Sequence, residues 1–355
     1  MTTKADTATQ ATAAEMVDWD LAVRLGARLA GEGPEVSAEE AAAAVAELRA
    51  DADRSTGLVR EFTGLVAAER TAPVLVVDRA GWVQANADAF QVVLSPLVAK
   101  LGEKRPSGLS KAIGSRVTGA EVGALLGFLA SKVLGQFDPF HQAEGEHGRL
   151  LLVAPNIVHV EREIQADPTD FRLWVCLHEE THRVQFTAVP WMRDHLFSEM
   201  TALADTLEPA KVLDDGLKRL TDALRSGPRS ASVIDLLGTP EQKEILDRVT
   251  GVMSLLEGHA DVVMDGVGPS VIPSVAHIRA QFNQRRKGVG PLDRILRKVL
   301  GLDAKMAQYR DGAKFVHGVV DKVGMAEFNA IWDNPAHLPS KAEIADPAAW
   351  VSRVL

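Results

Sequence analysis

The sequence predicts a mainly α-helical protein with a small β-sheet, of the α+β class. Long segments with apolar residues at helical spacing, several of them opened by capping residues, predict the helices. Two short β-branched runs, in residues 73–86 and 149–160, predict the strands. With 355 residues, the chain is long enough for one large domain or for two closely packed lobes.

The N-terminal part of the chain predicts a short tail followed by a mostly helical lobe. Residues 1–16 are rich in Thr and Ala and lack the apolar core of a signal peptide, so we expect a disordered tail. Residues 17–145 contain several helical patterns, one of them opened by Ser37 with Glu40 three residues on, which is a capping box. The β-branched run near residues 73–84 interrupts them and predicts either a hairpin or a strand that enters a helix.

One apolar segment, residues 119–137, resembles a membrane span. Glu121 and Lys132 cut its uncharged run to ten residues, well short of the roughly 20 that a bilayer requires. Glycine recurs in it at every fourth position, at Gly119, Gly123 and Gly127. This spacing predicts instead a buried helix that packs closely against a neighbour and ends before Pro139. We therefore expect no association with a membrane.

Residues 146–355 predict a second lobe, which we expect to pack with the first as one unit. A strand pair at residues 149–160 precedes a helix that starts after the cap formed by Asp167 and Pro168. A later helix begins at the N-cap Thr239 and runs to Asp265. An open strand edge beside the first of these helices could hold an extended peptide through main-chain hydrogen bonds.

The composition excludes some classes of function. A net charge of −9 and a pI near 5.6 argue against general nucleic-acid binding, which requires a basic surface. The single cysteine, Cys176, cannot form an internal disulfide, so the cytoplasm is the default location. Nothing in the sequence predicts an oligomeric state.

The strongest chemical signal lies in residues 171–186, where His178, Glu179 and His182 match the pattern H-E-x-x-H. Residues four apart share one face of a helix, so both imidazoles can bind a single ion while Glu179 lies beside them. The flanking residues are apolar, and a polar trio inside a buried helix favours a site over a coincidence. We expect Zn²⁺ at this site, with Glu179 as the general base toward water.

A catalytic zinc ion usually takes three protein ligands, so a third ligand is required. The longer pattern H-E-x-x-H-x-x-G-x-x-H is absent, because Ala188 stands where its last histidine would be. A glutamate from a later helix is the remaining common solution, and Glu257 is the candidate. Asp261 shares its face and could accept the outward N–H of a ligand histidine. The small residues Gly258 and Ala260 would let this helix approach the motif helix closely.

The sequence around these residues resembles a known family. The segments WVCLHEETHRVQF, LLEGHADVVMD, AQYRDGAKFV and VDWDLAVRLGARLA are similar to the zincin-like, gluzincin-type metallopeptidase family of actinobacterial proteins described as hydrolases. One subgroup of that family is named for its association with the biosynthesis of the deazaflavin coenzyme. The resemblance covers nearly the whole chain from Val17. It implies a zincin-like fold whose H-E-x-x-H helix packs against a Glu-bearing helix, with His178, His182 and Glu257 as metal ligands.

A few other residues are candidates for supporting roles. A hydrogen-bond donor should meet the oxyanion of the reaction; Tyr309, the single tyrosine of the chain, is the first candidate, ahead of His259 and Arg279. Cys176 lies two residues before the first histidine ligand and turns away from the ion, which predicts a buried thiol. Glu180 lies off the ligand face, where we expect it to be solvated or paired with an arginine.

These observations predict a zinc-dependent hydrolase, most simply a cytoplasmic metallopeptidase that cleaves peptide or amide bonds. Two alternatives remain open. One is a zincin scaffold that binds metal and serves as a binding or assembly protein, against which the intact Glu179 argues, since a binding site needs no base. The other is a hydrolase of a non-peptide amide linked to deazaflavin-coenzyme metabolism.

Overall fold

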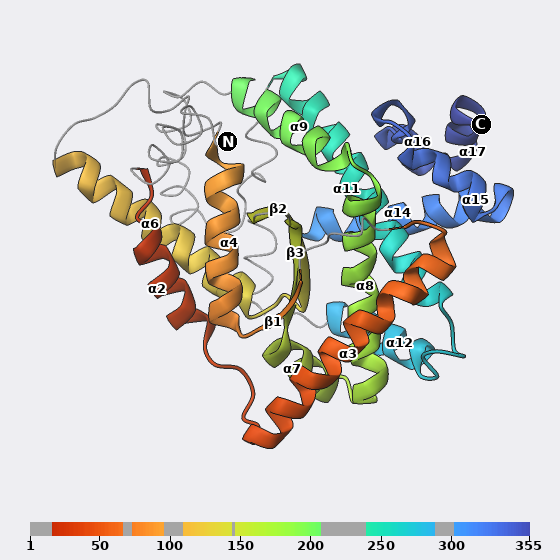
Figure 1. Cartoon of the computed structure of the whole chain (residues 1–355). Helices are drawn as coiled ribbons and strands as arrows, with labels where there is room; N and C mark the ends of the chain where they lie inside the picture. Colours follow the sequence, from red (N-terminus) through yellow and green to blue (C-terminus); the bar gives the residue numbers. More distant parts are fainter. Residues whose placement is uncertain (1–15, 67–72, 96–108, 144–145, 207–238, 288–301) are drawn as a thin grey trace. The chain divides into compact units, whose positions relative to one another are not determined.

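The computed structural model describes residues 16–66, 73–95, 109–143, 146–206, 239–287 and 302–355. It forms two compact units, which we consider separately: residues 1–193 with 267–278, and residues 194–266 with 279–355. Helices dominate the described ranges, and one three-stranded sheet lies in the first unit (Figure 1), which confirms the predicted α+β class. None of the helices in these ranges has the length and apolar character that a membrane span requires.

The sheet of the first unit has the strand order β1-β3-β2. β1 (Val74–Val77) runs parallel to β3 (Glu146–Val153), and β2 (Gly135–Ala143) runs antiparallel to β3. In the central strand β3, the four consecutive apolar residues 150–153 are each at most 1% exposed. An unbroken apolar run of this kind is expected of a strand that is covered on both faces.

Helices cover both faces of this sheet (Figure 1). On one face lie α2 (Trp19–Ala30), α4 (Arg79–Val93) and α6 (Leu109–Ala130), which share an apolar cluster with Leu151 and Val153. Side chains alternate along a strand, so Leu150 and Leu152 point to the opposite face. On that face lie α3 (Ala38–Thr63) and α8 (Pro168–Ala188). α8 contacts β2, β3 and α3, so the motif helix packs directly on the sheet.

The β-branched run near residue 73 is a strand that enters a helix, one of the two predicted forms. β1 is followed at once by α4, whose N-cap Asp78 accepts a hydrogen bond from the backbone N–H of Gly81 at 2.7 Å. The predicted capping box of Ser37 and Glu40 at the start of α3 is also present.

The predicted strand at residues 157–160 is wrong. This segment belongs to α7 (Ala154–Glu163), which has a proline in its first turn. Ile157, Val160 and Ile164 are buried and recur at helical spacing. Burial of one helix face therefore outweighs the preference of β-branched residues for strands.

The predicted helix end at Pro139 is also wrong. α6 ends at Ala130, and Pro139 lies in β2, where the pairing register with β3 shifts between Asp138 and Gln142. Proline has no N–H to donate, so an irregular edge strand is the place where a sheet tolerates it.

The glycine-spaced helix α6 packs closely, as predicted. A Cβ atom added at Gly119, Gly123 or Gly127 would lie 2.5, 2.6 or 2.7 Å from the backbone oxygen of Asp18, Ala22 or Gly26, respectively. No side chain fits at such distances, so the three glycines permit the contact between α6 and α2.

The described part of the second unit is helical. α11 (Pro240–Gly266) begins at the predicted cap, where Thr239 Oγ1 accepts from the backbone N–H of Gln242 at 3.2 Å. It packs on α14 (Leu302–Val323) through Gly258, where an added Cβ would lie 2.1 Å from the carbonyl carbon of Gly312. Gly258 therefore permits the close contact between α11 and α14.

The remaining helices of the described ranges after α8 are shorter than α11 and α14. They are α9 (Met192–Thr206), α12 (Val275–Lys287), α15 (Met325–Phe328), η2 (Asn329–Trp332), η3 (Pro335–His337), α16 (Lys341–Ala345) and α17 (Pro347–Val354). α9 is the first of the two helices predicted at residues 191–225, and the second lies outside the described residues.

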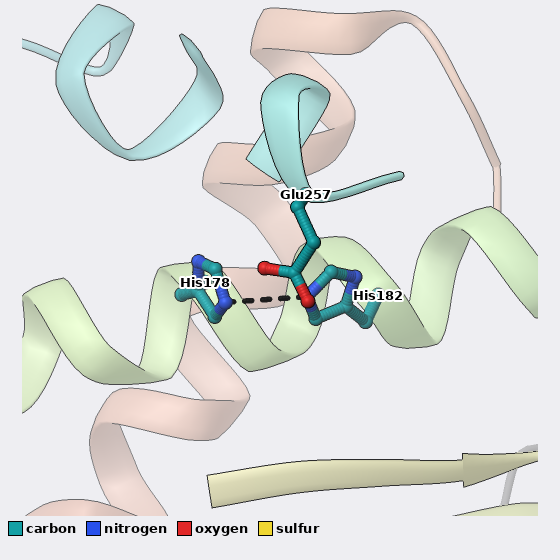
Figure 2. Close-up of side chains that lie close together, drawn as sticks. All are labelled: His178, His182 and Glu257. Carbon is teal, nitrogen blue, oxygen red and sulfur yellow. Dashed lines mark hydrogen bonds between the residues drawn. The ribbon is translucent and has the colours of Figure 1, made fainter. Parts of the chain in front are cut away.

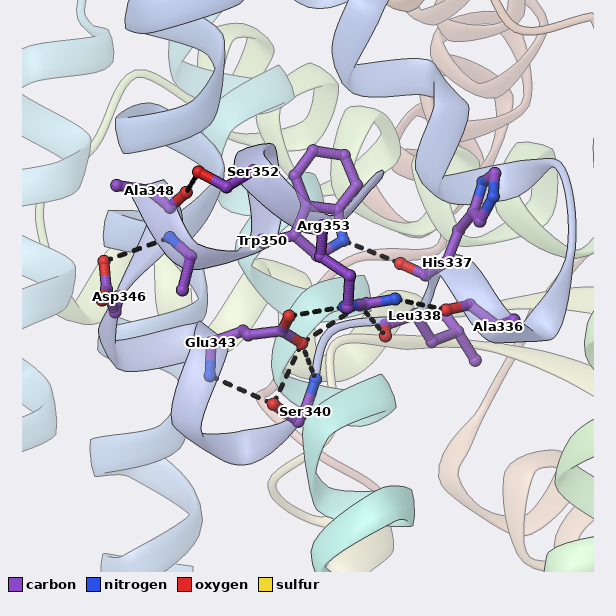
Figure 3. Close-up of polar contacts among 11 residues, drawn as sticks. Ala336, His337, Leu338, Ser340, Glu343, Asp346, Ala348, Trp350, Ser352 and Arg353 are labelled. Carbon is purple, nitrogen blue, oxygen red and sulfur yellow. Dashed lines mark hydrogen bonds and ion pairs between the residues drawn. The ribbon is translucent and has the colours of Figure 1, made fainter. Parts of the chain in front are cut away.

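Figure 3 shows how the C-terminal segment is held in the second unit. Arg353 of α17 donates to Glu343 of α16 at 2.6 Å and to the carbonyl oxygen of Ala336 at 2.6 Å. The indole N–H of the buried Trp350 donates to the carbonyl oxygen of His337 at 2.7 Å. These bonds tie the last helix to the turn that precedes α16.

Candidate metal centre

The motif helix α8 begins as its sequence predicts. The side chain of Asp167 accepts a hydrogen bond from the backbone N–H of Asp170 at 3.1 Å, and Pro168 occupies the first turn. Phe171 and Leu177 are fully buried. The helix is therefore a buried element of the first unit, with the motif in its C-terminal half.

Two arginines of α8 pair with buried acids and also link the helix to its neighbours α7 and α3. Arg172 binds Glu161 of α7 at 2.6 Å, and Arg183 binds Glu180 at 2.7 Å. Arg183 also donates to Thr56 of α3 at 3.0 Å. Burial raises the pKa of both Glu161 and Glu180, and the arginines offset this by stabilising the ionised carboxylates. Glu180 is thus paired with an arginine, one of the two environments predicted for it.

The rings of His178 and His182 turn the same nitrogen toward each other. Their Nε2 atoms lie 3.2 Å apart, and the ring planes meet at 88°. Two nitrogens bound to the same tetrahedral zinc ion, each at about 2.0–2.1 Å from it, lie about 3.3–3.4 Å apart. The pair therefore fits a single zinc ion with little rearrangement.

The other ring nitrogen of His182 has a partner on the same helix. Its Nδ1 lies 2.9 Å from Oε1 of Gln185, which is fully buried. Because a carbonyl oxygen only accepts, Nδ1 must carry the hydrogen of this bond.

Glu179 lies against the start of β2. It is 6% exposed. A Cβ atom added at Gly135 would lie 2.6 Å from its Cγ and 2.8 Å from its Oε1. The carboxylate therefore occupies the space that any side chain at position 135 would take.

Figure 2 shows His178 and His182 together with Glu257 of α11. One ligand atom from each of the three lies within 4.8 Å of the other two. Across the described ranges, this is the group of His, Cys, Asp and Glu side chains that could hold a metal ion. Two imidazoles and one carboxylate are a ligand set of zinc hydrolases, so the residue types also fit zinc.

Asp261 pairs with an arginine of the same unit. Its Oδ1 accepts from Arg279 at 3.0 Å, and Arg279 also donates to Asp265 at 2.8 Å. A guanidinium is a stronger hydrogen-bond donor to a carboxylate than a neutral imidazole N–H. Arg279, an oxyanion candidate, is thus engaged by two acids.

Three other residues that the sequence singles out are His259, Cys176 and Tyr309. His259 is a core residue, 1% exposed and stacked on Phe328 at 5.6 Å between ring centroids. Cys176 is buried, as predicted, and its thiol donates to the carbonyl oxygen of Leu48 at 3.7 Å. Burial raises the pKa of this thiol, which makes it unreactive. The side chain of Tyr309 lies outside the described residues.

Sequence reasoning missed two residues of this site, Gln185 and Gly135. Gln185 had a readable signal, because it follows His182 by three positions on a predicted helix and such pairs are neighbours. Gly135 had none, since its contact with Glu179 depends on the packing of β2 against α8.

Comparisons with known proteins support a metallopeptidase-like chain. The model of the zincin-like metallopeptidase family matches residues 17–351. The chain is also similar to the crystal structure of a provisionally assigned hydrolase with a novel fold from Chloroflexus aurantiacus. That similarity has a TM-score of 0.70 and 30% sequence identity, and it covers 95% of this chain and 98% of the other. Curated proteins gave no match.

Proposed function

The chain belongs to the zincin-like metallopeptidase family, and from this premise we propose that it is a zinc-dependent hydrolase that cleaves peptide or amide bonds. The observation that carries the proposal is the pair of facing Nε2 atoms, 3.2 Å apart, on a helix that also bears the buried Glu179. A site that only bound metal would have no need of a carboxylate buried beside the ligands. The similarity to a provisionally assigned hydrolase supports the same reaction class.

In this proposal, His178, His182 and Glu257 hold the ion and leave a fourth position open. A bound zinc ion would supply a Lewis acid for the substrate carbonyl and lower the pKa of water to about 7. The hydrogen-bonded Nδ1 of His182 keeps the ring turned so that Nε2 faces His178. Glu257 adds the single negative charge of the ligand set.

Glu179 is the proposed general base. Its carboxylate accepts a proton from the attacking water and delivers it to the nitrogen of the leaving amine. Because the residue is only 6% exposed, few solvent molecules compete for its oxygens. The missing side chain at Gly135 leaves room for the carboxylate on the sheet side.

The strand that would hold a peptide substrate is β2. The sequence predicts an open edge at residues 150–160, but β3 is paired on both sides and residues 157–160 are helical. Among the described strands, β2 lies at an edge and begins at Gly135, next to Glu179. A peptide paired with the start of β2 would bring a carbonyl group close to the base. Farther along β2, Pro139 is less suited to pair with a peptide. It lacks an N–H, and its carbonyl oxygen already accepts a hydrogen bond from Arg193 at 3.1 Å.

Metal analysis tests the ligands. Purified protein should hold about one zinc ion per chain, as expected for a site with three protein ligands. The double variant His178→Ala/His182→Ala should lose this zinc ion. The variant Glu257→Gln, which keeps the shape of the side chain, should bind zinc more weakly. Zinc content equal to wild type in the double variant would rule out the site.

Kinetics test the base. The variant Glu179→Gln should keep its zinc and lose peptide turnover by about 10²- to 10⁴-fold, the usual contribution of general base catalysis. Both proteins should be assayed on one peptide library at matched zinc content. Turnover that survives this substitution would contradict the proposed mechanism.

A further inference from the structure

We infer that Gln185 is a positioning residue that sets the tautomer of His182 for metal binding. The inference rests on the proposed zinc site and adds a residue to it. It also places the role expected of Asp261 on a different side chain, from the motif helix itself.

The inference follows from the two hydrogen-bond distances at His182. Neutral imidazole has one protonated and one unprotonated nitrogen. Gln185 Oε1, 2.9 Å from Nδ1, requires the hydrogen to be on Nδ1. The lone pair of the ring is then on Nε2, which faces His178 Nε2 at 3.2 Å. This is the tautomer that a metal ion bound at Nε2 requires.

The surroundings of Gln185 keep its amide in place. The residue is fully buried, so water does not compete for its carbonyl oxygen. The next residue, Phe186, packs against Phe137 of β2 with 5.7 Å between ring centroids. Two residues earlier, Arg183 is held by Glu180 and Thr56. The helix turn that carries Gln185 is thus fastened on both sides.

An amide suits this position better than a carboxylate would. Glu179 and Glu180 already place two buried acids on the same helix. A third buried carboxylate would require a further partner, whereas a neutral amide orients the ring without adding charge. When Nδ1 donates to an amide, Nε2 of the same ring is also less basic than when Nδ1 donates to a carboxylate, so Gln185 tunes metal affinity as well as geometry.

The test compares Gln185→Met, which removes the acceptor at similar size, with Thr187→Val as a matched control. Thr187 lies on the same helix and donates to Arg183 O at 2.7 Å, so the control also loses one hydrogen bond. We expect the Met variant to bind zinc about 10- to 100-fold more weakly in competition with a chelator. In the zinc-free protein, ¹⁵N NMR of labelled histidine should show the hydrogen of His182 moving from Nδ1 to Nε2. Thr187→Val should match wild type in both measurements.

A second variant, Gln185→Glu, retains a hydrogen-bond acceptor at position 185. It keeps the test decisive if Gln185→Met fails to fold. It should keep the hydrogen on Nδ1 and bind zinc at least as tightly as wild type. Wild-type zinc affinity together with an unchanged tautomer in Gln185→Met would overturn the inference, and so would a hydrogen on Nε2 in Gln185→Glu. Absence of zinc binding by the wild-type protein would instead overturn the proposed function, while the NMR comparison would still decide the role of Gln185.

Discussion

Two residues of the first unit, Gly135 and Gln185, affect the candidate site because each lacks a group. Gly135 has no side chain where the Glu179 carboxylate lies, and the neutral Gln185 adds no third buried acid to the motif helix. Both residues act on a neighbour that carries the chemistry. Their effects should therefore be visible in kinetics or metal binding before they are visible in stability.

Replacing Gly135 with alanine should displace the proposed base. The added Cβ would lie 2.6 Å from Glu179 Cγ, and a misplacement of about 1 Å can cost about 100-fold in rate. We expect a loss of turnover of that order, with zinc content unchanged. The control is Gly57→Ala in α3, where nothing lies within 4 Å of the added Cβ. Wild-type turnover in Gly135→Ala would show that the carboxylate does not act from this position.

Asp51 is a residue-scale determinant of how stability depends on pH. It is 7% exposed, and in the described structure its Oδ2 has no hydrogen-bond partner. Burial, with a smaller contribution from Glu47, raises the pKa of this carboxyl to about 6. In the unfolded chain the group ionises near pH 4. Its contribution to stability is therefore greatest below about pH 4 and is lost as the pH rises to about 6.

The variant Asp51→Asn should remove this pH dependence. At pH 8 the free energy of unfolding should rise by about 3 kcal/mol, because a buried charge is replaced by a neutral group of the same shape. At pH 4 the gain should be small. Urea denaturation at both pH values checks this, and an equal gain at both would mean that the carboxyl titrates normally.

At the scale of elements, close helix contacts explain where glycine occurs. In α6, an added Cβ at Gly123 would lie 2.6 Å from the backbone oxygen of Ala22, whereas one at Gly114 would meet nothing within 4 Å. The same helix therefore contains one glycine that packing requires and one that it does not. This gives a matched pair for measuring the contact between α2 and α6.

The two alanine variants should change stability in opposite directions. Gly123→Ala should lower the free energy of unfolding by about 1–3 kcal/mol, because it forces α6 away from α2. Gly114→Ala should raise it by about 0.5–1 kcal/mol, because alanine favours a helix over the unfolded chain. Urea denaturation of both variants measures the difference, and equal stabilities would show that α6 does not approach α2 this closely.

The elements were predictable where their signals are local. The caps at Ser37, Asp167 and Thr239, and the glycine spacing of α6, are patterns within a few residues. The edge strand β2 was not predictable, since Pro139 normally argues against a strand and only the pairing with β3 makes one. α7 had a readable helical pattern that its β-branched residues concealed.

At the scale of the whole molecule, the proposed zinc ligand Glu257 lies 75 residues after His182 in the sequence (257 − 182). The unfolded chain does not hold such groups together, so zinc should bind the folded protein preferentially. At a free zinc concentration of 100 times Kd, the free energy of unfolding should rise by about 2.7 kcal/mol. Thermal melts with zinc and with a chelator should show a higher Tm with zinc. The double variant His178→Ala/His182→Ala should show no such shift, and an equal shift would place the zinc elsewhere.

The sequence by itself determined the motif helix and the face that its two histidines share. His178 and His182 share a face because they are four residues apart on a helix, and this depends on local geometry alone. The tertiary structure decided which residues surround them: Gly135 against Glu179, Gly258 against α14, and Arg279 as the partner of Asp261. The Gly135 and Gly258 contacts join residues far apart in the chain, and the pairing of Asp261 follows from competition between possible partners. Packing and charge in the folded protein determine these contacts, and no short sequence pattern predicts them.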